Sequence, residues 1–454
     1  MVKKIILIYI LSVLTVLAGC AYEIAGSDDS GGTEEIALLS HRFNQTPEVR
    51  LPTPEEAEEF PQLTNLPTLY ITFEYLPSIR QLTRAHHYLP GSYTFIKGEE
   101  GGIFNEPFTI KRRGAWSYNH PKRPYTVELM RETSWGGLPP ATKWIMIANW
   151  SDKSLLRNHA VLQLARWVTD DWSPNSFFAD VFINGRYEGT YLITEPIEIH
   201  ENRLALDIST EAVFEINAIF RCKSSRGCSD CISVIGGNQH IIYRRPGGAL
   251  CSDARDSNLE WFRGFFAEMQ PALEQGYEVY SQFIDVPSFV NWYIVNEFVK
   301  NFDSAFTASC FAFFKNGKLH MGPVWDFDTC LGNQDIGPPM NKLDPAGFWV
   351  NTSPWFSRLT RDETFSRLVN ERWTELRQTG VFDDFLQMID DKAAHIAESA
   401  RLNFERWSCA LEFTGLRGTR SRFPSLFTHE EEVEHLRNWA MLRIEWLDTQ
   451  WYIG

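Results

Sequence analysis

The pattern of hydrophobic and polar residues changes from the period of strands to the period of helices along this chain. Three stretches in the first half predict strands: residues 68–73, 108–113 and 144–149. An apolar stripe at residues 289–298 then predicts a helix that Asp285 can cap. Beyond residue 333 the pattern is mostly helical. We therefore expect an α+β protein with a β-rich N-terminal part and a helical C-terminal part.

Two helices of the C-terminal part carry their own start or stop signals. Residues 362–379 have one apolar face, and Gly380 is positioned to end that helix. Thr428 and Glu431 form a capping box in front of a last apolar stripe. These stripes are typical of core packing.

Two Asn-Gly pairs, at residues 184–185 and 316–317, each lie between strand-like segments. Asn-Gly favours a type I′ turn, because both central residues of that turn need positive φ. If Lys315 pairs with Lys318 in the second hairpin, Thr307 lies opposite Asp326. The hairpin then returns Asp326 to the end of the structure where Asp303 begins.

Acidic residues flank this second hairpin. Asp303 lies in a loop after the helix that ends at Lys300, and Asp326 and Asp328 follow the returning strand. Loops held by rigid elements often carry catalytic groups. Converging carboxylates are what a divalent cation and a phosphate-transfer reaction require.

A basic strand–loop–strand segment precedes them, with Arg113, Gly114 and Ser117 in its first half. A loop of small residues can turn its backbone N–H groups toward phosphates. Lys122 or Arg123, on the returning strand, can then reach an α- or β-phosphate. The alternative interpretation is an ordinary exposed basic hairpin.

Three further charged residues have two interpretations each. Arg157 can bind a carboxylate or a nucleotide phosphate, or it can be a structural ion-pair residue. Glu195 ends a strand and can pair with Lys122, with Glu215 as a rival for that role; each can also be a surface residue. His159 lies among apolar residues and is expected to be a core histidine.

The N-terminus resembles a bacterial lipoprotein signal. Residues 1–19 contain a basic start and a short apolar run, and Cys20 ends a lipobox. Cleavage before Cys20 and lipidation of its thiol would anchor the protein to a membrane without spanning it. Residues 20–62 are acidic and rich in small residues, and they predict a flexible tether. We expect a cell-envelope protein, in the outer membrane or at the cell surface.

Net charge and cysteines add two expectations. The formal net charge of −15 makes nucleic acid an unfavourable partner. Four cysteines lie in a proposed insertion at residues 220–255: Cys222, Cys228, Cys231 and Cys251. Two disulfides or a structural zinc site would explain them. Cys310 and Cys330 flank the acidic residues and are not opposite each other in the proposed register.

The composite of motifs resembles the spore coat protein H (CotH) family of atypical secreted kinases. The family pattern N-x-D … G-P-x-W-D-x-D-x-x-x-G is matched by Asn301, Asp303, Gly322, Pro323, Trp325, Asp326, Asp328 and Gly332. Looser matches are Arg113-Gly114-x-x-Ser117 with Lys122, the segment Asp152 to Asn158, and the first Asn-Gly hairpin up to Glu195. The resemblance extends over about residues 66–335.

This resemblance implies a two-lobed, protein-kinase-like domain at residues 63–340, with residues 341–454 as the helical part of the same unit. It implies ATP and Mg²⁺ or Mn²⁺ as cofactors and Ser or Thr hydroxyls of a protein as acceptor. Asp326 and Asp328 would be metal ligands, Asp303 would orient the acceptor, and Lys122 would hold phosphates. Arg113, Gly114, Ser117, Arg157 and Glu195 would complete the nucleotide site.

One departure from the family leaves other functions open. Ser309 stands near the position of a family asparagine that helps to hold a second metal in kinases. One rival hypothesis is a cell-surface binding or assembly protein that has kept the fold and lost catalysis. Another is a different nucleotide-dependent transfer, such as adenylylation, on the same scaffold.

Overall fold

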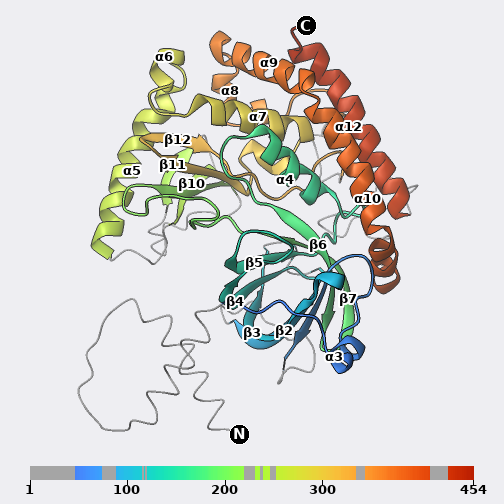
Figure 1. The fold of residues 1–454 in the computed structure, drawn as a ribbon. Coiled ribbons are helices and arrows are strands. Elements are labelled where there is room, and N and C mark those ends of the chain that lie inside the picture. The colour runs from blue at the N-terminus through green and yellow to red at the C-terminus, as the bar shows by residue number, and fades with distance from the viewer. Residues whose placement is uncertain are drawn as a thin grey trace, which may run out of the picture. The chain divides into compact units, whose positions relative to one another are not determined.

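The computed structural model describes residues 46–73, 88–114, 117, 120–218, 231–235, 239–245, 252–333, 343–408 and 428–454. Residues from Pro47 to Gly454 form one compact unit. Figure 1 shows strands in its N-terminal half and helices toward its C-terminus, so the predicted α+β class is confirmed. The two-lobed, kinase-like arrangement stays a prediction.

The N-terminal strands close into a seven-stranded barrel. Its order is β1 (Thr68–Thr72), β2 (Leu89–Ile96), β3 (Gly102–Arg112), β4 (Tyr125–Thr133), β5 (Ala141–Ile147), β7 (Arg186–Thr194) and β6 (Ser176–Ile183). Strand β6 closes the barrel by pairing in parallel with β1. Aromatic and aliphatic side chains such as Phe95, Val127 and Trp144 are completely buried in its core. The three predicted N-terminal strands are confirmed as β1, part of β3, and β5.

A separate five-stranded sheet carries the second hairpin. Its order is β12 (Lys318–Met321), β11 (Cys310–Lys315), β8 (Ala212–Asn217), β10 (Gln239–Arg245) and β9 (Cys231–Ile235). Lys315 pairs with Lys318, as predicted. Both Asn-Gly turns have positive φ at each residue: 49° and 74° at residues 184–185, and 51° and 81° at residues 316–317.

The proposed cysteine-containing insertion is partly regular structure. Strands β9 and β10 of the five-stranded sheet lie within residues 220–255. Cys231 begins β9, whereas Cys222, Cys228 and Cys251 lie outside the described residues. Their disulfide or zinc role stays a prediction.

Helices pack around this sheet and along one side of the barrel. They are α3 (Pro54–Glu59), α4 (Arg157–Val168), α5 (Ser252–Ala272), α6 (Tyr277–Tyr280), α7 (Val286–Val299), α8 (Phe356–Leu359), α9 (Glu363–Gln378), α10 (Val381–Arg406) and α12 (His429–Trp451). Helix α7 is buried along nearly its whole length. Helix α10 contacts β7 of the barrel as well as α4, α9 and α12, and thereby joins the barrel to the helical part (Figure 1).

Helices α7, α9 and α12 each begin at a side-chain cap, and those of α7 and α12 were predicted. The Asp285 carboxylate accepts a hydrogen bond from Ser288 N at the start of α7, and that of Asp362 accepts from Phe365 N at the start of α9. Thr428 and Glu431 form both halves of the predicted capping box. These caps satisfy N–H groups that have no partner within their own helix.

The flexible tether predicted for residues 20–62 is wrong in its C-terminal part. Residues 47–62 belong to the compact unit, where Arg50 exchanges backbone hydrogen bonds with Gly102. Thr53 caps α3 through a capping box, and Glu56 forms an ion pair with Arg50. Local capping and pairing order this acidic segment in spite of its composition. The signal sequence and Cys20 lie outside the described residues.

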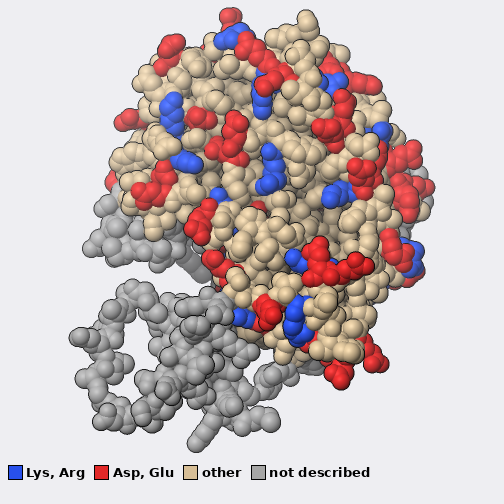
Figure 2. Space-filling model, in the orientation of Figure 1, with Lys and Arg blue, Asp and Glu red and all other residues tan. Residues whose placement is uncertain are grey.

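Figure 2 shows acidic side chains over much of the visible face, with basic side chains between them. The pattern accords with a formal net charge of −15. No helix of the described ranges is both long and apolar enough to cross a membrane.

Candidate functional site

Asp303 lies between the end of α7 and the start of β11 of the five-stranded sheet. Helix α7 ends at Lys300 in the left-handed conformation, and Asn301 caps the 3₁₀ helix η5 (Phe302–Ala305) by accepting a hydrogen bond from Asp303 N. The Asp303 carbonyl accepts hydrogen bonds from Thr307 N at 2.9 Å and from Cys310 Sγ at 3.2 Å. The predicted loop is therefore a short, well-bonded turn that presents a half-buried aspartate.

Asp326 approaches the same place from the returning strand. The Ser309 hydroxyl donates a hydrogen bond of 2.9 Å to Asp326 Oδ2. The pairing of β12 with β11 ends at Met321, before Asp326 is reached. Asp326 therefore does not lie opposite Thr307, as the predicted register required, and contacts Ser309 instead. Ser309 and Cys310 are adjacent, so one dipeptide contacts both Asp326 and the Asp303 turn. The hairpin brings the two acidic segments together, as expected.

The backbone at this contact is conformationally unusual. Ser309 has a φ of 54° and Asp326 a φ of 70°, in the left-handed region that side-chain-bearing residues rarely adopt. Such backbone strain is concentrated at functional sites, where the surrounding structure holds it in place. Both residues joined by this hydrogen bond have a left-handed backbone, which indicates that the Ser309–Asp326 contact belongs to a functional site.

Asp328 is held from the barrel side of the site. Its carboxylate accepts a hydrogen bond of 2.6 Å from the Ser151 hydroxyl, which follows β5 of the barrel. Burial, with the negative charge of Asp326 nearby, raises the pKa of Asp328 to about 7. A divalent cation would relieve both the desolvation and the repulsion of this acid pair. Because Mg²⁺ is commonly held by one or two carboxylates together with phosphate oxygens, Asp326 and Asp328 fit a metal–nucleotide site.

A small pocket joins these acids to the barrel. Four of the predicted site residues line it: Arg113, Ser117, Asp326 and Asp328. Residues of the segment after β5 complete the wall, among them Trp150, Ser151 and Asn158 at the start of α4. The lining therefore contains the residue types that a phosphate–metal complex requires, two carboxylates and an arginine.

Arg113 is the cation that faces the acids. Burial lowers the pKa of Arg113, whereas the charge of Asp326 acts in the opposite direction. The guanidinium lies 5.4 Å from the centre of the Trp325 ring, next to Asp326 in the chain. Gly114 follows with a φ of 93°, a conformation that favours glycine. An arginine held in this way can bind phosphate oxygens through two parallel hydrogen bonds.

Lys122 does not line this pocket. Its ammonium is buried and donates hydrogen bonds to Asn403 Oδ1 of α10 at 2.8 Å and to the Thr190 carbonyl of β7. Gly189 makes room for this arrangement, because a Cβ at that position would lie 3.2 Å from Lys122 Cε and 2.5 Å from Asn403 Oδ1. The structure thus uses Lys122 to join the barrel to α10.

The predicted pair between Lys122 and a glutamate is not formed among the described residues. Glu195 accepts a hydrogen bond from Asn175 N and lies 3.7 Å from Arg203 Nε. The rival residue Glu215 forms its ion pair with Arg244. Both glutamates are structural residues of the two sheets in this arrangement.

Lys122 is expected to make stability depend on pH above neutrality. Burial lowers the pKa of Lys122 from 10.5 to about 7, so between these values the unfolded chain holds a proton that the folded protein lacks. The free energy of unfolding should therefore rise as the pH increases from about 7 to about 9. Lys122→Met should flatten this rise, measured by urea denaturation across the pH range.

Lys318→Met, beside the turn of the second hairpin, is the control and should keep the rise. Lys300 acts in the same direction, because burial lowers its pKa to about 8, so the prediction concerns the difference between variant and wild type. Identical pH dependence in Lys122→Met and wild type would contradict it.

Arg157 has the structural role among its two predicted roles. Its guanidinium pairs with Asp152 at 2.6 Å and with Glu432 of α12 at 2.8 Å. It also donates to the carbonyls of Cys330 and Leu331, just beyond the acid pair. All of these partners are internal and Arg157 does not line the pocket, so the prediction of a direct nucleotide contact is wrong in this structure.

His159 is the expected core histidine. It is buried and shares a hydrogen bond of 2.9 Å with Ser176 Oγ of the barrel. Burial lowers the pKa of His159 to about 3, so the ring is neutral in the folded protein at physiological pH. It does not face the acidic site.

Sequence reasoning missed several residues that hold the acid pair. Asn158 belongs to a sequence motif that predicts no role for it, yet its Oδ1 accepts a hydrogen bond from Phe327 N, between the two aspartates. Asn333 Nδ2 donates to the carbonyls of Asp328 and Ser151. The signal for Asn158 was its position after Arg157 at a helix start. Ser151 and Asn333 had no signal, because their partners come from distant parts of the chain.

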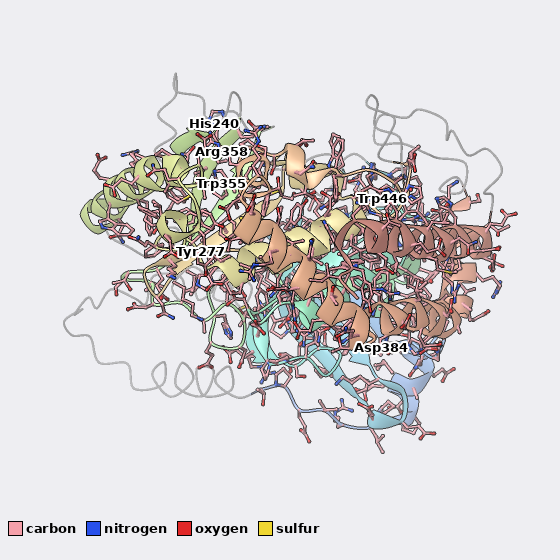
Figure 3. All side chains as sticks on the ribbon, turned by 90° about the horizontal axis from the view of Figure 1, so that it is seen from above. His240, Tyr277, Trp355, Arg358, Asp384 and Trp446 are labelled. Carbon is pink, nitrogen blue, oxygen red and sulfur yellow. The ribbon has the colours of Figure 1, made fainter. Side chains whose placement is uncertain are left out.

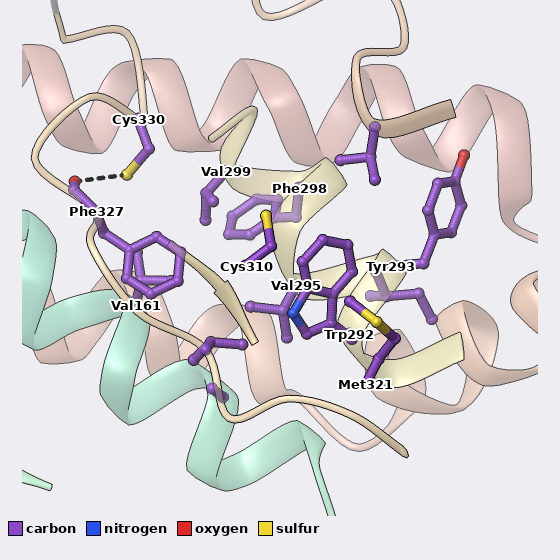
Figure 4. Packing of buried hydrophobic residues seen from close by; sticks show 14 of the residues in the cluster. Val161, Trp292, Tyr293, Val295, Phe298, Val299, Cys310, Met321, Phe327 and Cys330 are labelled. Carbon is purple, nitrogen blue, oxygen red and sulfur yellow. Dashed lines mark hydrogen bonds between the residues drawn. The ribbon is translucent and has the colours of Figure 1, made fainter. Parts of the chain in front are cut away.

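The hydrophobic core behind the site contains both described free cysteines. Figure 4 shows Cys310 and Cys330 near Val299, with the Cys330 thiol donating to the Phe327 carbonyl. Burial raises the pKa of both thiols well above the usual range. Both are therefore packing residues in the thiol form, and Phe327 anchors the two aspartates to this core.

These features define an α+β protein in which a barrel and a helical part share an acidic, arginine-containing pocket. The sequence model of the family described as CotH kinase protein matches residues 110–447 of the 454-residue chain. The chain therefore belongs to the CotH kinase protein family. No curated protein matches the sequence. Family membership indicates a kinase-like function that generally uses ATP and a divalent metal.

Proposed function

We propose that this chain is a phosphotransferase that moves the γ-phosphate of ATP to Ser or Thr hydroxyls of a protein, with Mg²⁺ or Mn²⁺. The observation that carries the proposal is the convergence of Asp326, Asp328 and Arg113 on one pocket. Opposite charges that line one pocket suit a metal–triphosphate, which needs carboxylates for its cation and a guanidinium for its anionic oxygens.

Each residue then has a defined task. Asp326 and Asp328 would hold the divalent cation, whose charge would stabilise the negative charge of the phosphates. Ser309 and Ser151 orient the two carboxylates through their hydrogen bonds. Arg113 and Ser117 bind phosphate oxygens from the barrel side of the pocket.

Asp303 would act on the acceptor. The acceptor oxygen forms a bond to the γ-phosphorus while the bond from that phosphorus to the β–γ bridging oxygen breaks, and ADP leaves. Asp303 orients the acceptor hydroxyl and takes its proton late in this displacement, then releases it to solvent. The position of its turn beside Ser309 and Asp326 supports this task.

The N-terminal sequence supports a location for this reaction. The basic start, the apolar run and Cys20 in its lipobox favour an exported lipoprotein anchored in the outer membrane or at the cell surface. The acceptor would then be a protein of the cell envelope. Nucleic acid is not a proposed partner, because the chain is strongly acidic.

Asp303→Asn tests the proposal directly. The variant should lower the rate of phosphate transfer by about 10²-fold or more, because it removes the group that takes the acceptor proton. Binding of Mn²⁺–ATP, read as a rise in thermal midpoint, should match the wild type. Transfer would be measured by mass spectrometry of dephosphorylated casein incubated with protein, ATP and Mn²⁺.

The same spectra separate the alternative reactions. Addition of a nucleotide mass in place of a phosphate mass would establish adenylylation and overturn phosphoryl transfer. Equal transfer by Asp303→Asn and wild type would remove Asp303 from the mechanism.

A binding or assembly protein without catalysis is the second candidate function. Ser309 in place of the family asparagine favours it, and so does the engagement of Lys122 with Asn403 away from the pocket. In this case the wild type would transfer no phosphate. Its pocket residues would then serve metal or partner binding alone.

A further inference from the structure

The segment after the acid pair is held in place by α7 and α12. Glu297 of α7 is completely buried, and its two carboxylate oxygens accept hydrogen bonds from Trp349 N and Val350 N, each at 2.7 Å. Arg443 of α12 pairs with the same carboxylate at 2.8 Å. A buried ion pair thus binds the backbone at Trp349 and at the start of η7 (Val350–Thr352).

Carbonyl groups of residues 344–347 are bound by two cations. Arg443 Nη1 donates to the carbonyls of Pro345 and Gly347, at 2.6 Å and 2.8 Å. Lys300 Nζ, at the end of α7, donates to those of Asp344 and Ala346, at 2.8 Å and 2.6 Å. Four successive carbonyls therefore accept hydrogen bonds from side chains of other elements, which leaves this backbone little freedom.

Helix α12 holds this region through one polar stripe. The stripe consists of residues at helical spacing. Arg443 binds the carbonyls of Pro345 and Gly347, and Trp439 binds that of Leu343. One turn further toward the start of α12, His435 contacts the Gly332 carbonyl and Glu432 pairs with Arg157. Trp446, labelled in Figure 3, adds an edge-to-face contact with Phe348, whose ring centroid lies 4.9 Å from its own. The C-terminal helix therefore binds the chain on both sides of residues 333–342.

Trp349 transmits this fixed position to the Asp303 turn. Its indole Nε1 donates a hydrogen bond of 3.2 Å to the carbonyl of Phe302, the residue before Asp303. Its ring also stacks on the Phe302 ring, with centroids 5.8 Å apart. The backbone of Trp349 is bound to Glu297, so the indole is a rigid contact from outside the turn.

We propose that Trp349 is a positioning residue for Asp303, and that the Glu297–Arg443 pair holds Trp349 in that role. The inference rests on the proposed function for its catalytic consequence, whereas its structural consequence can be measured separately. Trp349 does not touch the pocket that would hold ATP, since it is absent from the pocket lining. Its loss should therefore affect turnover and leave nucleotide binding intact.

The test variant is Trp349→Phe, which retains a ring against Phe302 and removes the N–H donor. We expect kcat for phosphate transfer from ATP to casein with Mn²⁺ to fall about threefold to tenfold, the value of one hydrogen bond. The KM for ATP should stay within about twofold of the wild type, because the ATP pocket is unchanged. Amide hydrogen exchange at residues 303–307 should become faster.

Trp144→Phe is a matched control. Trp144 is buried in the barrel, and its Nε1 donates to the carbonyl of Ala141 over the same distance of 3.2 Å. The Trp144→Phe variant loses an equivalent hydrogen bond within the barrel and not at the Asp303 turn, so neither kcat nor exchange at residues 303–307 should change. Phe302→Leu is a second variant: it removes the stacking partner but keeps the carbonyl, and should change both readouts in the direction of Trp349→Phe.

The outcomes separate this inference from the proposed function. Faster exchange at residues 303–307 in Trp349→Phe, absent in Trp144→Phe, supports the positioning role even if the wild type transfers no phosphate. Unchanged exchange in both Trp349→Phe and Phe302→Leu overturns it. A fall in kcat accompanied by an equal rise in KM for ATP also overturns it, because the residue would then act on nucleotide binding.

Discussion

Asp326→Ala is expected to abolish metal-dependent ATP binding and to lower phosphate transfer by at least about 10³-fold, since electrostatic stabilisation is usually the largest single contribution to such reactions. Asp326 accepts the hydrogen bond from Ser309, and its negative charge acts on the pKa of Arg113. Without it, only one carboxylate of the proposed pair would remain, and Arg113 would lose the negative charge that acts to raise its pKa. The measurements are the rise in thermal midpoint with Mn²⁺–ATP and the rate of phosphate transfer.

Asp171→Ala is the control for this variant. Asp171 is also a half-buried aspartate with a hydrogen-bond partner, His320, but it does not line the acidic pocket. It should keep both the thermal shift and the transfer rate. The same Mn²⁺–ATP shift in Asp326→Ala as in the wild type would remove the metal–nucleotide assignment of this pocket.

Arg157→Met is expected to lower the free energy of unfolding by about 3–5 kcal/mol, the usual cost of removing one partner from a buried ion pair. The variant leaves Asp152, completely buried, and Glu432, nearly so, without their cation. It also removes the donors to the Cys330 and Leu331 carbonyls. Urea denaturation at neutral pH would measure the difference.

Arg401→Met provides the comparison on the surface of α10. Arg401 pairs with Glu398 and Glu405, but about half of each of these side chains is exposed. Its loss should change the free energy of unfolding far less than the loss of Arg157, because water screens exposed ion pairs. Adding Asp152→Asn and Glu432→Gln to Arg157→Met should recover part of the loss, because the stranded charges are then neutral. Equal effects of Arg157→Met and Arg401→Met would refute a buried ion-pair role.

The parts of the fold that sequence reasoning predicted best are those with short-range causes. An Asn-Gly turn needs positive φ at two adjacent residues, and both predicted hairpins have it. The predicted caps at Asp285 and Thr428 depend on hydrogen bonds that span three residues. Such signals are complete within a few positions, so they can be read without knowing the rest of the chain.

The closed barrel was not predicted, because closure depends on the parallel pairing of β1 with β6 across more than one hundred positions. The alternation of apolar residues identifies strands, but it does not state which strands become neighbours. The wrong prediction of a flexible tether at residues 47–62 has a related cause. Composition suggested disorder at residues 47–62, whereas the contact of Arg50 with Gly102 incorporates them into the fold.

The candidate site divides in the same way. Asp303, Asp326 and Asp328 were placed by a motif and a hairpin register, both local in the chain. Lys122 was misplaced because its direction depends on Asn403, which lies 281 positions away. Ser151 reaches Asp328 across 177 positions, and no pattern around either residue announces that contact.

By itself, then, the sequence determined the two Asn-Gly hairpins, the caps of α7 and α12, the family and the candidate acids, because these are recorded in local spacing and in contiguous motifs. Only the tertiary structure decided which cation faces those acids. Arg113 enters the pocket, while Lys122 joins the barrel to α10 and Arg157 binds α12 to the segment after Asp328. The physical reason is that a buried charge must lie where its partners are, and those partners come from helices formed near the other end of the chain.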